Sequence, residues 1–252
     1  MTSSGIGSVS EAVPADSTDL IRHEAPPTDA DILFYQTAAG SVYEQMLAAT
    51  APLHSAYCQA NRLDYVAFKG VRRGFYSWQA TFNRVEMLHE LLADGFRGWF
   101  VYLDADAVVR QSRFDLRRYL GKRQSAALIA APGGPQHWDI NAGIFFLNLG
   151  HDLGRVIAAR WWQATHRAVS DEMLRASREP WQPLDDGRQF PDDQHLLQME
   201  LLRDKALAGA LLRESSGLIN LANGRFIRQF LRATGSPEDR LAAVRDAVMQ
   251  AV

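Results

Sequence analysis

Residues 99–109 read Trp99-Phe-Val-Tyr-Leu-Asp104-Ala-Asp106-Ala-Val-Val109, so two carboxylates stand one residue apart inside an apolar run. An apolar run of this length, bounded by turn residues, is typical of a buried strand. Burying a charge without a partner is costly, so a strand has no structural reason to carry two acids. In an extended chain residues i and i+2 point to the same side. Asp104 and Asp106 would therefore aim oxygen donors at one point, as a divalent cation shared with a phosphate requires.

Strands and helices alternate on both sides of this run. Hydrophobic spacing predicts four further strands and five helices, with Ser41 and Glu44 as a capping box at the start of the first helix. The strands are expected over 31–37, 63–68, 125–131 and 140–148, and the helices over 41–59, 79–93, 153–168, 192–202 and 238–252. This alternation implies an α/β layered sheet with helices on both faces. Such sheets bind ligands beyond the carboxyl ends of their strands, where Asp104 and Asp106 would lie.

The composition excludes several classes of protein. The chain has 252 residues, of which 47% are hydrophobic, as in an ordinary globular protein. Its 27 basic and 29 acidic side chains give a net charge of −2, which argues against a nucleic-acid partner. Cys58 is the only cysteine, so an intrachain disulfide and a structural cysteine zinc site are excluded. Motifs of dinucleotide-binding, P-loop and α/β-hydrolase proteins are missing as well.

Four motifs stand in the order found in known glycosyltransferases. Residues 99–109 resemble the Asp-X-Asp segment of GT-A-fold enzymes, above all the galactosyl- and xylosyltransferases of glycosyltransferase family 34, with family 8 next. Three other stretches look like motifs of the same families: Trp78 to Arg84 leading a helix, Asn141-Ala-Gly143, and Asp193-Gln194. The resemblance implies the GT-A fold, which is a Rossmann-like mixed sheet flanked by helices. It also implies a nucleotide sugar donor, with UDP as the expected nucleotide, and a glycan, lipid or small-molecule acceptor.

The chain then divides into three parts. Residues 1–30 are rich in Ser, Thr, Pro, Asp and Ala and predict a disordered leader without a secretory signal. The resemblance covers residues 31–235, the expected GT-A domain, and residues 236–252 are expected to form a C-terminal helix packed on it. No apolar run approaches the roughly 18 residues of a membrane-spanning helix. We therefore expect a cytoplasmic protein, for which a transient contact with a membrane surface stays compatible.

The resemblance implies a metal and donor site. Asp104 would contact the ribose and, with Asp106, a Mn²⁺ or Mg²⁺ ion that bridges the donor's diphosphate and neutralises charge on the leaving group. The other implied donor-binding residues are Tyr35, Gln36, Thr37, Arg84, Asn141, Ala142 and Gly143. Purely structural roles are open for three of them: a partly buried ring for Tyr35, an exposed helix cation for Arg84 and a β-bulge for Gly143.

Asp193 and Gln194 are the implied catalytic residues. The families resembled retain the anomeric configuration and place a Gln or a carboxylate near the reacting carbon. Asp192 or Asp193 also fits a helix N-cap, for which Asp is favoured. Trp181, in the polar stretch 170–190, is expected to stack on a sugar face.

One departure from the family pattern concerns the metal site. Those families usually complete it with a His near the C-terminus, but this chain has no His after His195. Gln229 stands where that His is expected, and its side-chain carbonyl is an oxygen ligand suited to Mg²⁺ or Mn²⁺. Alternatively, Arg228 or Arg232 binds the diphosphate directly and reduces the demand for metal.

Two other functions remain open at this point. A metal-dependent nucleotidyltransferase also uses paired carboxylates on an α/β sheet. It would need a basic phosphate-binding loop after the first strand, and Thr37-Ala-Ala-Gly40 contains no basic residue. A non-catalytic relative that binds a nucleotide sugar is the second alternative, because the expected His is missing.

Overall fold

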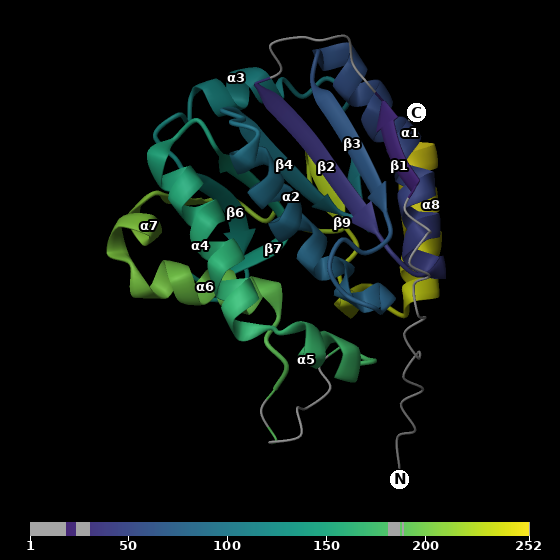
Figure 1. Ribbon diagram of the computed structural model, residues 1–252. Helices are drawn as coiled ribbons and strands as arrows, with labels where there is room; N and C mark the ends of the chain where they lie inside the picture. The colour runs from purple at the N-terminus through teal and green to yellow at the C-terminus, as the bar shows by residue number, and fades with distance from the viewer. Residues whose placement is uncertain (1–18, 24–30, 181–186, 188, 252) are drawn as a thin grey trace.

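A computed structural model describes residues 19–23, 31–180, 187 and 189–251 as an α/β fold (Figure 1). Its main sheet has seven strands in the order β1-β3-β2-β4-β7-β6-β8. They are β1 (Asp19–His23), β2 (Ile32–Ala38), β3 (Asp64–Lys69), β4 (Trp99–Asp104), β6 (Leu128–Pro132), β7 (Ile140–Asn148) and β8 (Leu211–Arg213). A two-stranded sheet pairs β5 (Ala107–Val109) with β9 (Ile227–Gln229). The apolar run 99–109, predicted as one strand, is therefore divided by a turn at residues 105–106, and the other predicted strands join β4 in the main sheet.

The sheet is mainly parallel, and this brings the ends of its central strands together. β2 runs parallel to both β3 and β4, and Thr37 lies opposite Asp104 in the register. β7 runs antiparallel to β4, so the beginning of β7 reaches the same edge as the end of β4. After Asp104 the chain turns into β5, which leaves the main sheet and pairs with β9.

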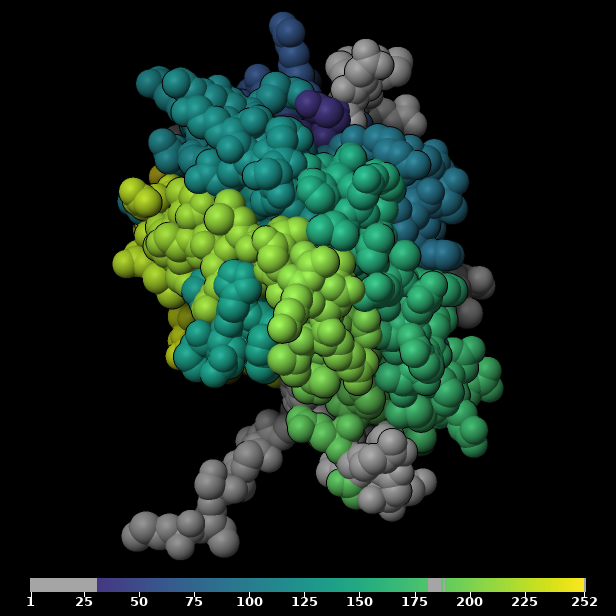
Figure 2. Space-filling view, turned by 90° about the vertical axis from the view of Figure 1, so that its left-hand side faces the viewer, coloured from purple at the N-terminus to yellow at the C-terminus, as the bar shows by residue number. Residues whose placement is uncertain are grey.

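Helices cover both faces of the sheet, as the alternating pattern predicts. One face carries α1 (Ser41–Asn61), α3 (Leu116–Gly121) and α8 (Pro237–Ala251), and α8 packs against α1. The other carries α2 (Asn83–Ala93), α4 (Asp152–Ala168), α6 (Asp193–Arg203) and α7 (Lys205–Gly209). Figure 2 shows the second side of the molecule, where the green and light-green chain of α4, α6 and α7 forms much of the surface. Two short 3-10 helices, η1 (Ser77–Phe82) and η2 (Arg232–Thr234), and α5 (Asp171–Ala176) complete the described elements.

Each face of the sheet has its own apolar core, because side chains alternate along a strand. Phe34, Val101 and Leu103 pack toward α1, whereas Phe100 and Tyr102 pack toward α2 and α4. Trp161, one of two adjacent tryptophans on α4, is fully buried in the second core. The cores hold the central strands rigidly and so fix the edge at which β2 and β4 end.

Besides the break at residues 105–106, the structure departs from the predicted elements at the first helix and in the predicted leader. The first helix is capped by Gly40 rather than Ser41, because Gly40 adopts a positive φ of 87° and its N–H donates to Glu44 Oε1. Residues 19–23 form β1, antiparallel to β3, within the region predicted as a disordered leader over 1–30. A five-residue strand satisfies the free backbone groups at a sheet edge, and composition averaged over 30 residues conceals it. In the described part of the chain, no helix is long and apolar enough to cross a membrane.

Candidate active site

A cleft of about 740 Å³ opens where β2 and β4 end. Several parts of the chain line it: the β2–α1 loop, η1 with the start of α2, the Asp-X-Asp segment, the start of β7, the start of α6 and residues 229–240. This is the edge at which α/β sheets bind ligands. Asp104 and Asp106 both line the cleft, together with Asp193. The three acids come from separate elements, so the fold assembles the cleft around negative charge.

Asp104 ends β4 with its two carboxylate oxygens in different surroundings. The Tyr102 hydroxyl donates to Oδ1 over 3.0 Å, and Arg84 Nη1 lies 3.6 Å from the same oxygen. Oδ2 instead lies 3.3 Å from Gln229 Nε2. The side chain is one-third exposed to the cleft. Oδ1 is therefore held by Tyr102 and Arg84, while Oδ2 lies on the side of Gln229.

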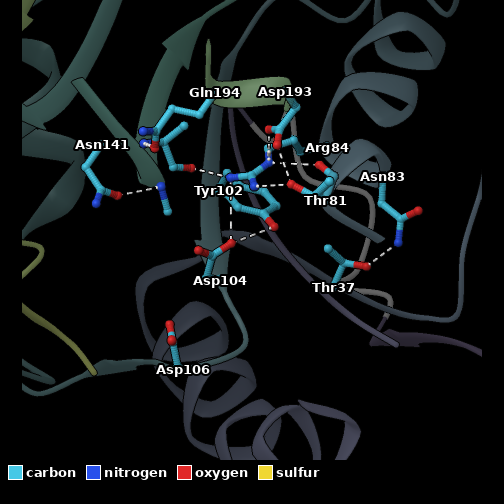
Figure 3. Close-up of polar contacts among 12 residues, drawn as sticks. Thr37, Thr81, Asn83, Arg84, Tyr102, Asp104, Asp106, Asn141, Asp193 and Gln194 are labelled. Carbon is cyan, nitrogen blue, oxygen red and sulfur yellow. Dashed lines mark hydrogen bonds and ion pairs between the residues drawn. The ribbon is translucent and has the colours of Figure 1, made fainter. Parts of the chain in front are cut away.

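Arg84 is buried beneath the cleft and held by many contacts (Figure 3). Its Nε lies 2.8 Å from Asp193 Oδ2. The guanidinium donates to both the carbonyl and the hydroxyl oxygen of Thr81 over 3.1 Å, and to the carbonyl of Ala142. It also lies over the Tyr102 ring, 4.5 Å from the centroid. Arg84 is thus a fixed counter-charge and not an exposed helix cation; we call Arg84 and Asp193 the Arg84 pair.

The two adjacent acids at the start of α6 have separate roles. Asp192 caps the helix, because its carboxylate accepts from the backbone N–H of His195 over 2.6 Å. Asp193 is buried, accepts the Thr81 hydroxyl, and uses its carbonyl to accept from Trp161 Nε1 over 2.8 Å. Since Asp192 supplies the cap, the Asp193 carboxylate is available to the cleft.

Asp106 belongs to a second buried ion pair on the other side of the cleft. Arg240 Nη1, from α8, lies 2.8 Å from Asp106 Oδ2, and both side chains are almost fully buried. Arg240 Nη2 donates to the Tyr43 hydroxyl over 2.7 Å, whereas its Nε is buried without a hydrogen-bond partner. Gln229 Nε2 lies 3.3 Å from Asp106 Oδ1. We call Arg240 and Asp106 the Arg240 pair.

Burial makes the acids of the cleft harder to ionise. It raises the pKa of Asp106 to about 7, with a further contribution from the charge of Asp104, and that of Asp193 to about 6. Burial also raises the pKa of Asp104, although Arg84 opposes the shift. A cation that binds to such carboxylates competes with protons near neutral pH.

The start of β7 closes the cleft from a third side. Asn141, Gly143 and Gln194 line the cleft, and the oxygens of both amides are engaged: Asn141 Oδ1 accepts from Gly143 N and Gln194 Oε1 from Ala142 N, each over 2.8 Å. A Cβ on Gly143 would lie 2.7 Å from Asp104 Oδ2, so the backbone approaches the acids closely only because it is glycine. Ala142 is buried, and its backbone groups bind Arg84 and Gln194 rather than a ligand.

Of residues 35–37, which were predicted to contact the donor, only Thr37 lines the cleft. Thr37 lines the cleft and accepts from Asn83 Nδ2 over 2.7 Å. Tyr35 is buried against Phe100 and Tyr102, and Gln36 is buried toward α1. Successive side chains of a strand point to opposite faces, so three consecutive residues cannot all face one ligand. Trp181 lies outside the described residues.

Sequence reasoning missed several residues that build the site. Tyr102 had a usable signal, because it lies two positions before Asp104 and so on the same side of the strand. Thr81 and Asn83 lie within the motif that leads to Arg84, but their hydroxyl and amide carry no spacing signal. Arg240 stands 134 residues from Asp106 in the chain, and only the packing of α8 on α1 brings it to the cleft.

The donor set suits a hard divalent cation. Among the described residues there is no cluster of three or more His, Cys, Asp or Glu side chains able to hold a metal. Asp104 Oδ2 and Asp106 Oδ1 nevertheless face one amide, Gln229, whose Oε1 is buried without a partner. A half-turn of that amide exchanges its nitrogen and oxygen. Three oxygens would then converge, which is a ligand set that Mg²⁺ and Mn²⁺ accept.

Comparison with known proteins establishes the fold. No family model and no curated protein sequence matches the chain. Among solved structures, it is similar to a glycosyltransferase involved in the glycosylation of the major capsid of PBCV-1. The two share 13% identity at a TM-score of 0.59, over 85% of this chain and 98% of that one. Apo mouse xyloside xylosyltransferase 1 aligns at a TM-score of 0.41 and 11% identity, over 82% of this chain and 99% of that one.

The chain has the GT-A glycosyltransferase fold, as the sequence predicts. The likeness is to this fold and not to glycosyltransferase family 34 in particular.

Proposed function

We propose that the protein is a metal-dependent glycosyltransferase that moves a hexose or pentose from a nucleotide sugar, with UDP as the expected nucleotide and with retention. One observation carries this proposal. Two carboxylates and an amide converge beside a buried Arg–Asp pair, inside the cleft of a GT-A fold. The carboxylates and the amide would hold the cation that a diphosphate needs. The Arg–Asp pair would stabilise positive charge on the sugar carbon. Both stand within one cleft of about 740 Å³.

Asp104, Asp106 and Gln229 would hold Mn²⁺ or Mg²⁺. When bound, the cation neutralises the charge that develops on the leaving diphosphate. Arg240 is the counter-charge of Asp106, and a bound cation would take over that role. The guanidinium of Arg240, together with Arg232 on the cleft wall, would then contact the phosphate oxygens.

The remaining residues would place the sugar. Thr37 and the β2–α1 loop offer a surface for the nucleoside. Asn141 and Gln194 stand at the start of β7 and α6, where their amides face sugar hydroxyls. Asp193 would stabilise positive charge on the anomeric carbon, and Arg84 holds its carboxylate in place. The acceptor, whether glycan, lipid or small molecule, would enter from the open side of the cleft.

The structure disfavours nucleotidyl transfer more than a non-catalytic role. The β2–α1 loop that lines the cleft, Ala38–Gly40, supplies no basic side chain for a triphosphate. A non-catalytic nucleotide-sugar protein would bind in the same way but would not need the Arg84 pair. A carboxylate buried beside an arginine costs stability that mere binding does not require.

The test is release of UDP from a panel of UDP-sugars, with Mn²⁺, with Mg²⁺ and with EDTA. We expect release from at least one donor, dependent on the cation, and NMR of the product would show the anomeric configuration. Binding of UDP without turnover of any donor would support the non-catalytic alternative. Pyrophosphate formation from UTP and a sugar phosphate would support the nucleotidyltransferase instead.

A further inference from the structure

Gln36 is a buried amide on the side of β2 that turns away from the cleft. It faces α1 and meets three other buried polar side chains: Thr50 and His54 from α1, and Tyr65 from β3. We call these four residues the Gln36 network. None of them lines the cleft, and the catalytic roles proposed above use none of them. A buried polar cluster of this kind demands an explanation, because apolar packing would be simpler.

The hydrogen bonds of the network define where its protons lie. The backbone N–H of Val109 donates to His54 Nε2 over 3.1 Å, so Nε2 carries no proton and Nδ1 does. Nδ1 then donates to Gln36 Oε1 over 2.9 Å, and the Tyr65 hydroxyl donates to the same oxygen over 2.9 Å. Because Oε1 is thereby the acceptor, Gln36 Nε2 is left to donate to the carbonyl oxygen of Asp104 over 3.2 Å.

The network therefore binds the short segment 104–109 at both of its ends. Gln36 binds the carbonyl of Asp104, where β4 stops, and His54 binds the amide of Val109, where β5 stops. Between them lies the turn that carries Asp106. Functional groups of a site must be held within about 0.5 Å of their working geometry, and a second layer of hydrogen bonds usually does so. The network thus holds the start of the turn at Asp104 and the end of β5 at Val109, and the Phe230 N–H, which donates to the carbonyl of Asp106 over 3.2 Å, holds the turn between them.

We infer that the Gln36 network positions the Asp-X-Asp turn, so that Asp104 and Asp106 present their carboxylates at the spacing that the cation and the diphosphate need. This inference rests on the proposed function. Gln36 and His54 are positioning residues that act through the backbone of the turn, and they do not touch the donor. The predicted donor contact of Gln36 is thereby replaced by a role behind the sheet.

Four variants of the network test this role against a matched control. Gln36→Leu removes the hydrogen bond to the Asp104 carbonyl together with the acceptor of His54 and Tyr65. Tyr65→Phe removes one hydroxyl. His54→Leu and His54→Gln form a pair, because a glutamine amide again offers an acceptor to Val109 and a donor to Gln36. The control is Tyr57→Phe. Tyr57 is a buried tyrosine in the same core, but its hydroxyl donates to the carbonyl of Phe114 over 2.7 Å, away from the turn.

The measurement is the Kd of UDP in the presence of Mn²⁺, by calorimetric titration, beside the Tm of each variant. We expect Gln36→Leu and His54→Leu to raise Kd by about 10–100-fold. Tyr65→Phe should raise it by about 2–10-fold, the effect of one hydrogen bond. His54→Gln should recover part of the loss, and Tyr57→Phe should lower Tm without changing Kd.

Two results would overturn the inference in different ways. If Tyr65→Phe and Tyr57→Phe lower Tm equally and both leave Kd unchanged, the network is structural only, even where Gln36→Leu fails to fold. If the unaltered protein does not bind UDP with Mn²⁺, the proposed function itself fails, and the inference fails with it. Titration of the unaltered protein with UDP and Mn²⁺ distinguishes the two cases.

Discussion

The Arg84 pair and the Arg240 pair stand on opposite sides of one cleft, and their arginines are held very differently. Arg84 is bound by Asp193, Thr81 and Ala142 and stacks on Tyr102. Arg240 is bound through its terminal nitrogens by Asp106 and the hydroxyl of Tyr43 and lies 5.3 Å from the centroid of the Tyr43 ring, while its Nε has no hydrogen-bond partner. Both pairs are buried, so burial does not distinguish them.

The difference indicates which charge can be exchanged. Removing the Arg84 side chain would leave Asp193 without its counter-charge and would remove the donor to the carbonyls of Thr81 and Ala142, so we interpret that pair as a permanent part of the site. Removing Arg240 leaves Asp106, whose pKa burial already raises to about 7, to take up a proton or a cation. We therefore interpret the Arg84 pair as preorganised for the sugar, and the Arg240 pair as a stand-in for the cation of the diphosphate.

The largest expected effect distinguishes Asp193, which we assign to sugar transfer, from Asp106, which we assign to donor binding. Asp193→Asn should lower kcat by about 10²–10³-fold, because a neutral amide cannot stabilise positive charge on the sugar carbon. The same variant should leave the Kd of UDP with Mn²⁺ within twofold, since Asp193 faces the sugar side. Asp106→Asn should instead raise the Kd of UDP with Mn²⁺, because it removes a carboxylate that would bind the cation. Steady-state kinetics combined with calorimetric titration measures both quantities. If both variants changed Kd alike, the division between the pairs would be wrong.

The next effect concerns the free energy of unfolding and whether a cation can replace the arginine of each pair. Arg84→Met should destabilise the fold by about 3–5 kcal/mol, because it leaves a buried carboxylate unpaired. Arg240→Met should cost only about 1–3 kcal/mol, since the Asp106 carboxyl can take up a proton. Urea unfolding with and without Mn²⁺ measures the difference. Mn²⁺ stabilises every variant that still binds it, and it should recover more stability in Arg240→Met, where it supplies the missing counter-charge of Asp106, than in Arg84→Met. Equal recovery in both variants would contradict an exchangeable Arg240.

Much of this cleft could be predicted from the sequence, because local rules govern those parts. The apolar run before Asp104 and the alternation of strands and helices predicted the sheet and its ligand-binding edge. The sequence predicted a helix cap at Asp192 or Asp193, and the structure assigns the cap to Asp192. The motif that contains Arg84 predicted a cation at the cleft, where the structure places it.

Other parts of the site were missed for physical reasons. Residues 35–37 were assigned to the donor as a block, although strand alternation already prevents three consecutive side chains from facing one ligand. Arg240 could not be found by any spacing rule, because its position depends on how α8 packs against α1. The edge strand β1 escaped notice because its pairing partner, β3, lies elsewhere in the chain.

A smaller effect is expected between the two pairs, where Asp104 and Gln229 meet the backbone of β7. Gly143→Ala would place a Cβ 2.7 Å from Asp104 Oδ2 and closer still to Gln229 Nε2, so the carboxylate and the amide must separate. We expect the Kd of UDP with Mn²⁺ to rise by about 10–100-fold, as for other changes beside a metal site. Gly209→Ala is the matched control, because a Cβ there meets no atom within 4 Å. An unchanged Kd in Gly143→Ala would show that Asp104 and Gln229 do not act together.

The smallest effect is a pH dependence that should differ between the two pairs. Burial raises the pKa of Asp193 to about 6, so its neutral form persists to higher pH than usual and the charge is lost as the pH falls through 6. With Mn²⁺ and donor saturating, kcat should therefore be level above pH 7 and fall by about tenfold per unit well below pH 6. The Thr81 hydroxyl bond to Asp193 opposes this shift, so Thr81→Val should move the fall to higher pH. At the Arg240 pair, where the pKa of Asp106 is about 7, protons should instead weaken the apparent affinity for Mn²⁺ below pH 7. A pH profile whose fall stays in place in Thr81→Val would assign it to another group and remove Asp193 from the chemical step.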